Sequence, residues 1–338
     1  MTSQRSQPAL SRPDYFKAFN IQLMNILLQV PLLSVGIEGW LFASRAFADQ
    51  SKDYLAWQQW RSFLAALVNP HFAYRWFNVL KSPRFIVVAT HRQRLYFKPF
   101  RVYMSAKWTI KQKVKVIHDT YRFILGRGES FMQVITSSNG IQMANFKLSD
   151  ASEGKLVLGY DDRYRKEGEL VISFVCNELG GVLAAAAFSF EEVNTRQWVC
   201  RIGCVQGNKT DFESSSKTAQ KLMHGLRPKS LVIFAVQEFA RQLEFSELYG
   251  AGDSIQAYRR KHVVHLPWIH DIQCDYNAMW DEAGGLPDRE GWYDLPLIPV
   301  RKDMQEIKSN KRSLYHKRYS LLDELSLKIA ETAKTIVE

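Results

Sequence analysis

The run VLAAAAFSF, residues 182–190, is followed after a short polar turn by WVCRIGCVQG, residues 198–207. The first run is almost entirely apolar or small, which is typical of a central strand that is covered on both faces. Asn194 and Thr195 lie between the two runs and signal a turn, and so short a connection makes neighbouring strands antiparallel. The two runs therefore predict the middle of an antiparallel sheet.

The sequence around these runs predicts a sheet bounded by helices. Earlier β-rich runs are expected at Phe131–Thr136, Ile141–Leu148, Leu156–Tyr160 and Glu169–Cys176. Arg227-Pro228 begins a wide-faced apolar helix, because proline is favoured in the first turn, and Leu248–Ala251 is the expected returning strand. Apolar residues at helical spacing in Tyr54–Leu67, a Thr109 cap and an amphipathic Leu314–Ile336 segment predict further helices.

These elements predict an α+β protein with an N-terminal helical region, a mostly antiparallel mixed sheet backed by helices, and a C-terminal helix. The expected parts, in chain order, are an N-terminal extension over residues 1–50, a basic helical region over 51–130, an α/β core over 131–300 and a basic C-terminal helix over 301–338.

The charge of the chain is high and uneven. It has 338 residues and a net charge of +11, from 45 Lys and Arg against 34 Asp and Glu. The segment from Arg75 to Arg127 holds thirteen of the basic residues and one acidic residue, Asp119. Such an excess indicates an anionic partner: a nucleic acid, an acidic lipid surface or a phosphorylated small molecule. With 46% hydrophobic residues, disorder is excluded for most of the chain.

The sequence gives little support for paired cysteines, for a metal site or for a membrane span. The four cysteines form no CxxC pair and predict buried apolar residues in a reducing compartment. His262, His265 and His270 with Asp271 suggest a metal site only weakly, because Pro267 prevents one helix from carrying all three histidines. The apolar run Ile21 to Ala43 is interrupted by polar residues and by Pro31, so we expect no membrane span and a cytoplasmic protein.

Four motifs, in this order along the chain, resemble the bacterial VirK/YbjX family. They are Glu167-Gly168-Glu169-Leu170, Ile202-Gly203-Cys204-Val205-Gln206-Gly207, the segment from Lys217-Thr218 through Met223-His224-Gly225-Leu226-Arg227-Pro228-Lys229, and Lys311-Arg312-x2-Tyr315-x2-Arg318-Tyr319-x-Leu321-Leu322. The resemblance covers roughly residues 50 to 325 and implies a role in virulence, envelope stress or tolerance of antimicrobial peptides in Gram-negative bacteria. It brings no settled catalytic mechanism.

The order of antiparallel strands, a helical segment and one more strand also resembles the core of GNAT-type N-acyltransferases. That resemblance implies a coenzyme A thioester as acyl donor, with Gln206 and Gly207 ending the donor-binding strand. Lys209, Lys217, Arg227 and Lys229 would supply charge for its phosphates. The sequence departs from that family in one respect, because Gln206-Gly207 is followed by no second glycine for 17 positions.

Glu169 and His224 are the predicted catalytic residues. Glu167 and Glu169 are two apart, so in a strand they share a face where they fit a general base or an acidic substrate site, or else a solvated edge. His224 to Lys229 fits either an anion-binding corner at a helix start or a tight turn with Gly225 as the C-cap.

The basic N-terminal half carries a second function hypothesis. Aromatic and basic residues alternate between residues 94 and 108: Arg94, Phe97, Lys98, Phe100, Arg101, Tyr103, Lys107 and Trp108. This pattern suits an anionic membrane face, with aromatic side chains at the headgroup level, a single-stranded nucleic acid, or a basic surface without a partner. The alternative to an acyltransferase-like enzyme is therefore a peripheral membrane or nucleic-acid-binding regulatory protein, and we expect the membrane face.

Overall fold

The computed structural model describes residues 32–207, 212–257 and 274–337, and the chain divides after Phe97 into two compact units. None of the described helices is long and apolar enough to cross a bilayer. Each unit has its own buried core.

The first unit is helical. Its helices are α2 (Leu32–Ala46), α3 (Lys52–Val68), α4 (Pro70–Lys81) and α5 (Ile86–His91), followed by the 3-10 turn η1 (Gln93–Phe100). Asn69 separates α3 from α4, and Pro70 takes the first position of α4, where proline is favoured. The buried Tyr96 fixes η1 to the helices: its hydroxyl lies 2.8 Å from Ser62 Oγ, and its carbonyl accepts from Trp76 Nε1 at 3.1 Å.

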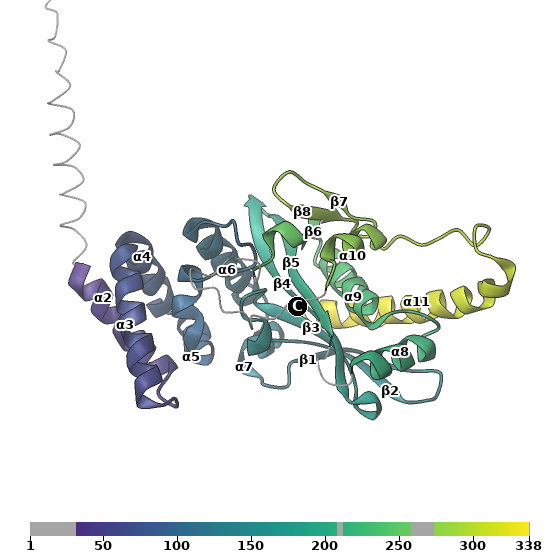
Figure 1. The fold of residues 1–338 in the computed structure, drawn as a ribbon, viewed down its shortest axis with the longest axis horizontal. Helices are drawn as coiled ribbons and strands as arrows, with labels where there is room; N and C mark the ends of the chain where they lie inside the picture. Colours follow the sequence, from purple (N-terminus) through teal and green to yellow (C-terminus); the bar gives the residue numbers. More distant parts are fainter. Residues whose placement is uncertain (1–31, 208–211, 258–273, 338) are drawn as a thin grey trace, which may run out of the picture. The chain divides into compact units, whose positions relative to one another are not determined.

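The second unit contains an eight-stranded sheet in the order β1-β2-β3-β4-β5-β6-β8-β7 (Figure 1). Its strands are β1 (Ile141–Lys147), β2 (Glu153–Gly159), β3 (Leu170–Cys176), β4 (Gly181–Asn194), β5 (Gln197–Gly207), β6 (Glu247–Ala251), β7 (Leu286–Pro287) and β8 (Trp292–Leu295). All neighbours are antiparallel except β5 and β6, which are parallel. The mostly antiparallel mixed sheet of an α+β protein is therefore confirmed.

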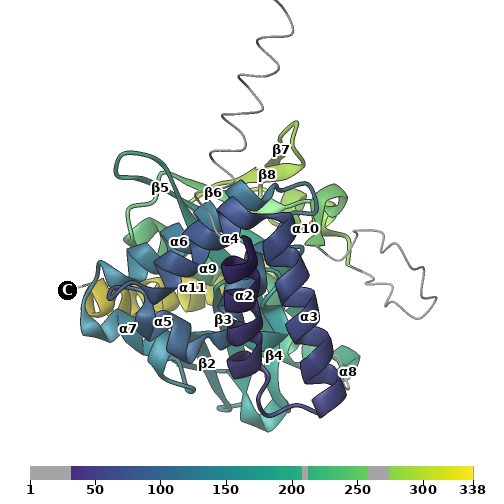
Figure 2. The same cartoon turned by 90° about the vertical axis from the view of Figure 1, so that its left-hand side faces the viewer.

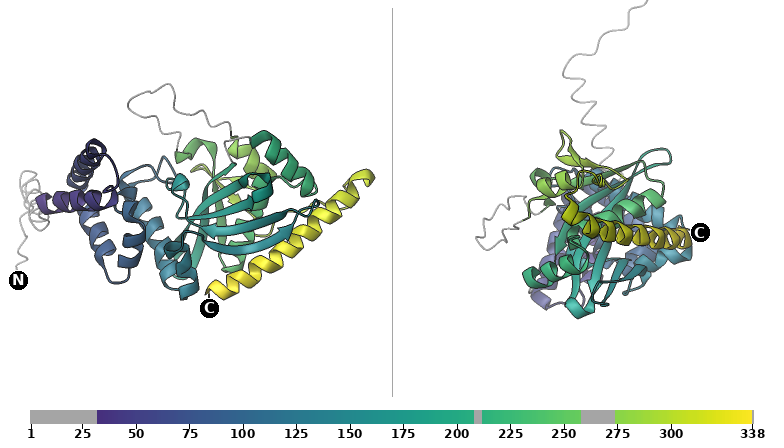
Figure 3. Two further views of the ribbon diagram at one scale, coloured as in Figure 1. Left: turned by 90° about the horizontal axis from the view of Figure 1, so that it is seen from below. Right: turned by 90° about the vertical axis from the view of Figure 1, so that its right-hand side faces the viewer.

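Helix α9 (Pro228–Gln242) is the crossover between β5 and β6, and it is buried on nearly every side. It packs on β3, β4 and β5, and the C-terminal helix α11 (Ser309–Val337) packs on it in turn. Figure 3 shows α11 running along the same side of the sheet. Phe239 of α9 contacts Phe188 of β4 at 6.3 Å between ring centroids, so apolar side chains fill this layer.

One predicted strand is wrong. Residues 131–136 belong to helix α7 (Glu129–Thr136), which buries Phe131, Val134 and Ile135. Their spacing of three and one fits a helix, and so short an apolar run fits either kind of element by pattern alone. Phe131 meets Phe239 of α9 at 6.3 Å, and packing of this kind decides for the helix.

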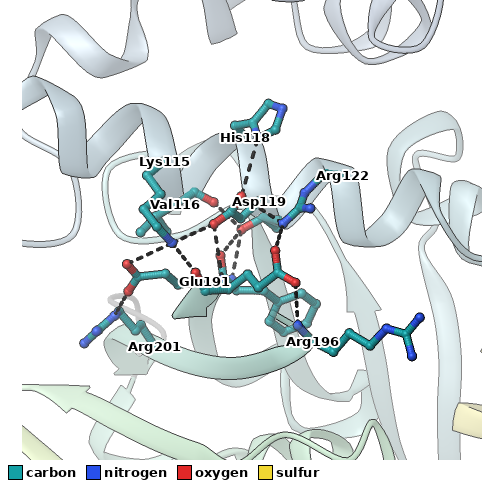
Figure 4. A network of polar contacts seen from close by, with 11 residues as sticks. Lys115, Val116, His118, Asp119, Arg122, Glu191, Arg196 and Arg201 are labelled. Carbon is teal, nitrogen blue, oxygen red and sulfur yellow. Dashed lines mark hydrogen bonds and ion pairs between the residues drawn. The ribbon is translucent and has the colours of Figure 1, made fainter. Parts of the chain in front are cut away.

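Helix α6 (Ile110–Leu125) is fastened to the β4–β5 hairpin by a polar network (Figure 4). The predicted Thr109 cap is confirmed as a full capping box with Gln112. Asp119 accepts hydrogen bonds from Lys115 Nζ at 2.9 Å and from the Glu192 amide at 3.2 Å. Arg122 and Lys115 also bond to Glu192, and we call this set the α6 clasp.

Candidate active site

Strands β5 and β6 pair along only the first part of β5. Their parallel pairing runs from Val199 and Glu247 to Ile202 and Gly250, whereas β5 continues to Gly207. Within the described part of the chain, β5 has no strand partner on this side beyond Ile202. The backbone of residues 203–207 is therefore available to groups other than a neighbouring strand.

Two glycines bring Glu167 to the point where the strands part. A Cβ on Gly203 would lie 1.9 Å from the Glu167 carbonyl oxygen, and a Cβ on Gly168 would lie 2.5 Å from the Phe188 amide nitrogen. The segment of residues 167–168 therefore crosses β4 closely and reaches β5, which only glycine at both positions permits. The Glu167-Gly168 and Ile202-Gly203 motifs thus contact each other.

Glu167 is a buried carboxyl group with little support. The residue is 7% exposed, and among the described residues no side chain donates a hydrogen bond to its carboxylate. Burial raises the pKa of Glu167, and the charge of Lys166, a hydrogen bond from the Lys166 backbone and the charge of Lys98 only partly offset that effect. A carboxyl group in this state takes up a proton more readily than a solvated one.

Glu169, the predicted catalytic carboxylate, is instead fully engaged. Its two oxygens accept hydrogen bonds from Lys98 Nζ and from the Tyr121 hydroxyl, each at 2.7 Å, and its side chain is completely buried. Its backbone amide donates to Ser189 Oγ, which also meets the Tyr103 hydroxyl at 2.7 Å. Burial lowers the pKa of Lys98, and the Glu169 carboxylate acts against that. This arrangement fits a buried ion pair that positions its neighbours.

Cys204 of β5 directly follows Gly203, which contacts the Glu167 backbone. Burial raises the pKa of the Cys204 thiol well above its usual value, and Glu167 and Cys274 raise it further through their charge. Cys274 in turn accepts from Lys229 Nζ at 3.3 Å. The charges of Glu167 and Cys274 therefore both act on Cys204, and Lys229 bonds to Cys274.

Helix α10 (Tyr276–Glu282) lies against both strands at the gap. The Tyr276 hydroxyl donates to the Val205 carbonyl at 3.3 Å, and Trp280 Nε1 donates to the Ala251 carbonyl at 2.9 Å. Gly250 leaves room for the Trp280 ring, because a Cβ there would lie 2.5 Å from it. The predicted donor-site residues Gln206 and Gly207 end β5 in this region.

The remaining predicted donor residues are distributed around the start of α9. Arg227 is exposed, and its Nη1 lies 2.8 Å from Glu282 Oε2 of α10. Lys229 lies in the first turn of α9, and Lys217 is exposed on α8 (Phe212–Leu222). Lys209 lies outside the described residues, so only Gln206, Gly207, Arg227 and Lys229 are brought to the gap and its adjoining helices.

His224 forms part of a packed turn between α8 and α9. Its carbonyl accepts from Arg318 Nε at 3.1 Å and from Arg318 Nη2 at 3.0 Å, and Gly225 leaves room for that guanidinium. Burial lowers the pKa of His224, and the charges of Lys317 and Arg318 lower it further. The third and fourth family motifs therefore contact each other here, and Glu169 lies apart from them at the start of β3.

The alternating aromatic and basic stretch is not a continuous surface. Phe97 and Tyr103 are buried in cores, and Lys98 is paired with Glu169. Among the described residues no group of three or more His, Cys, Asp or Glu is placed to hold a metal ion. His262, His265, His270 and Asp271 lie outside the described residues.

Comparisons with known proteins identify the family. A family model described as "Protein of unknown function (DUF535)" matches residues 52–331. "Uncharacterized protein YbjX" of Escherichia coli K12 is 30% identical over 273 residues, which cover 79% of this chain and 81% of that protein. An uncharacterised protein of Haemophilus influenzae is 34% identical over 135 residues, or 38% of this chain and 42% of that protein. The chain belongs to the DUF535 family, and the resemblance to VirK/YbjX proteins is confirmed.

One solved structure is similar at a lower level. A cAMP-binding acyltransferase from Mycobacterium smegmatis matches with a TM-score of 0.27 and 11% identity, and the match covers 56% of each chain.

Proposed function

We propose that the protein transfers an acyl group from a thioester donor to an amine or hydroxyl acceptor, with Glu167 as general base. The observation that carries the proposal is the position of this buried carboxyl group at the point where β5 loses its partner β6. The backbone groups of residues 203–207 other than the Val205 carbonyl, which accepts from Tyr276, can bond to an extended ligand arm, and a carboxylate of raised pKa is a stronger base than a solvated one.

In the proposed step, each bond that forms is matched by one that breaks, and each proton has an acceptor. The acceptor nitrogen or oxygen attacks the thioester carbonyl and forms a new bond to carbon, while its proton passes to the Glu167 carboxylate. The carbon–sulfur bond then breaks, and the thiolate that leaves takes up a proton. The residues of this chain bind the donor along β5, position the acceptor beside Glu167 and keep water away through the buried surroundings.

The residues at the start of α9 fit a phosphate-bearing donor such as coenzyme A. Arg227 and Lys229 flank a helix N-terminus, where free amide groups and the helix dipole favour negative charge. Among the described residues, Arg227 forms one ion pair, an exposed one with Glu282, which a phosphate can replace at little cost. These two residues would hold the phosphates, while the thioester end lies toward Glu167.

The test is thiol release from a panel of acyl-coenzyme A donors with polyamine and hydroxyl acceptors. Wild-type protein should release thiol, and Glu167→Gln should bind the donor with unchanged affinity while turnover falls by about 10²–10⁴-fold, the usual contribution of a general base. Glu306→Gln, an exposed carboxylate on the same unit, is the matched control and should be unaffected. Equal turnover by Glu167→Gln, or no donor binding by wild type, would contradict the proposal.

The cellular role that we propose follows from the family resemblance: tolerance of antimicrobial peptides and envelope stress, exerted from the cytoplasmic side of the inner membrane. A strain lacking the gene should regain peptide tolerance with the wild-type gene and not with Glu167→Gln. Full recovery with Glu167→Gln would separate the cellular role from acyl transfer and favour a non-enzymatic binding protein.

A further inference from the structure

The helical unit carries an unusual apolar surface on the hairpin formed by α2 and α3. Two rows of large apolar side chains at helical spacing, each 50% to 77% exposed, make up what we call the α2–α3 apolar face. Its residues are Leu33, Ile37 and Leu41 of α2 and Trp57, Trp60, Leu64 and Val68 of α3. Figure 2 shows the two helices side by side.

The exposed row of α3 contacts α2 through one pair of aromatic rings. The ring of Trp60 meets that of Trp40 edge to face at 5.2 Å between centroids, so the exposed row of α3 adjoins α2 at this pair. A Cβ on Gly36 would lie 2.6 Å from the Phe63 ring, and a Cβ on Gly39 would lie 3.0 Å from the Ser62 carbonyl. Gly36 and Gly39 thus let the Phe63 ring and the Ser62 backbone approach closely between the helices, whereas the seven residues of the face are left exposed.

An ordinary amphipathic hairpin exposes charged residues on its outer side, whereas this hairpin exposes large apolar residues there. Contiguous exposed apolar surface of this kind marks a site of interaction. Two tryptophans in the face favour a bilayer interface, where an indole ring contacts apolar chains and its N–H contacts polar headgroups.

The net positive charge of the helical unit favours an anionic lipid surface as the partner of this face. Residues 32–97 contain eight Lys and Arg and three Asp and Glu, a net charge of +5. Glu38 is paired with Lys81, and Asp49 and Asp53 lie together at the end of the hairpin where α2 joins α3. Basic residues exposed on the unit include Arg45, Lys52, Arg75, Lys81 and Arg84. A second copy of this chain would be repelled by that charge, whereas an anionic bilayer is attracted.

We propose that the α2–α3 apolar face docks the protein on an anionic lipid surface, with its apolar rows in the headgroup boundary and the basic residues at the phosphates. This inference is independent of the proposed acyl transfer, because it concerns the other compact unit. It also moves the expected membrane contact from residues 94–108 to the two helices that precede them.

The test is flotation of the full chain with vesicles of phosphatidylglycerol and phosphatidylcholine, and with vesicles of phosphatidylcholine alone. The triple variant Trp57→Gln, Leu64→Gln and Val68→Gln removes three exposed apolar side chains. Its affinity for the anionic vesicles should be lower by about tenfold or more, because each substitution removes apolar surface that the bilayer would bury. The matched control, Ile298→Gln, Val300→Gln and Leu327→Gln, removes equally exposed apolar residues from the second unit and should bind as wild type.

Binding should also weaken as salt rises and should be lower on phosphatidylcholine alone, because the basic residues contribute through screened charge. Undiminished binding by the triple variant would overturn the proposal. So would a wild-type dimer that the triple variant converts to monomer, because the face would then join two copies. Binding that is lost on removal of residues 1–31 and kept in the triple variant would also overturn it.

Discussion

Glu167 and Glu169 illustrate how position within two residues changes the chemistry of a carboxyl group. Both are buried, but Glu169 has a cation and a hydroxyl at its oxygens, whereas Glu167 has neither among the described side chains. A buried ion pair with all its bonds satisfied stabilises a fold only as long as both partners remain. A buried carboxyl group without a side-chain partner costs stability and gains reactivity.

Lys98→Met should therefore destabilise the protein by about 3–5 kcal/mol, because it leaves the Glu169 carboxylate buried without its cation. The double variant Lys98→Met with Glu169→Gln should recover much of that loss, since no uncompensated charge remains. The measurement is urea unfolding at neutral pH. Lys107→Met, at an exposed lysine, is the control, and an equal effect of both lysine substitutions would refute a structural role for the Lys98 pair.

Glu167→Gln should raise the urea midpoint at pH 7 to 8. The pKa of Glu167 is raised in the folded state, so the folded state holds its proton more tightly than the unfolded state, whose carboxyl has a pKa of about 4.3. The contribution of this group to stability is greatest below that value and falls as pH rises through the folded-state pKa. The gain from Gln should vanish near pH 4; a loss of stability at pH 7 would show that the carboxylate is supported after all.

Arg227→Ala addresses the two interpretations of the corner at the start of α9. The ion pair with Glu282 is more than half exposed on both sides, so its loss should cost about 1 kcal/mol or less and shift Tm by no more than about 3 °C. Affinity for an acyl-coenzyme A donor should fall with Ala and also with Lys, which lacks the planar fork. A fall in Tm of many degrees with unchanged donor affinity would assign Arg227 to the turn alone.

At the scale of elements, contacts between remote segments decide the architecture. The four family motifs form two contacting pairs: Glu167-Gly168 against Gly203 of β5, and the His224-Gly225 turn against Arg318 of α11. Each pair uses a glycine to admit a neighbour, which explains why these small residues occur within the motifs. The α6 clasp also joins segments that are remote in sequence, but through charged groups: it holds α6 to the β4–β5 hairpin (Figure 4).

Asp119→Asn should weaken that clasp in a pH-dependent way. Burial alone would raise the pKa of Asp119, but bonds from His118 and Lys115 outweigh it and the pKa is lowered. Its stabilisation is therefore present above the unfolded-state pKa of about 3.9 and is lost as pH falls through the folded-state value. Asn should cost about 1–3 kcal/mol at pH 7 and less below pH 3 in urea unfolding, and a cost that does not change with pH would contradict this account.

At the scale of the whole molecule, the sheet was predictable because its signals are local. Each signal can be recognised within a few residues of sequence. The signals are the apolar runs of the central strands, Thr109 before α6 and Pro228 at the start of α9. Residues 131–136 were predicted as a strand because an apolar run of that length fits either a strand or a helix, and packing on Phe123 and Phe239 decides for the helix.

The site was predictable only in part. The end of β5 and the start of α9 follow from local sequence, and the structure brings Lys229 to Cys274 across 45 positions. Lys98 and Glu169 are 71 positions apart in the sequence. Lys98 was expected at the surface, but its pairing with Glu169 places it in the interior. No local pattern marks such a pair, although the glycine after each of Glu167 and Ile202 was a signal of close backbone approach.

The most direct test of the central claim is hydrogen exchange of the backbone amides of residues 203–207 with and without a non-hydrolysable acyl-coenzyme A analogue. If the donor lies along the strand edge that β6 leaves open, amides of this segment should exchange more slowly when the analogue is bound, while those of β1 and β2 should not change. Protection of other segments alone, with the exchange of residues 203–207 unchanged at saturating analogue, would contradict the assignment of the active site to the parting of β5 and β6.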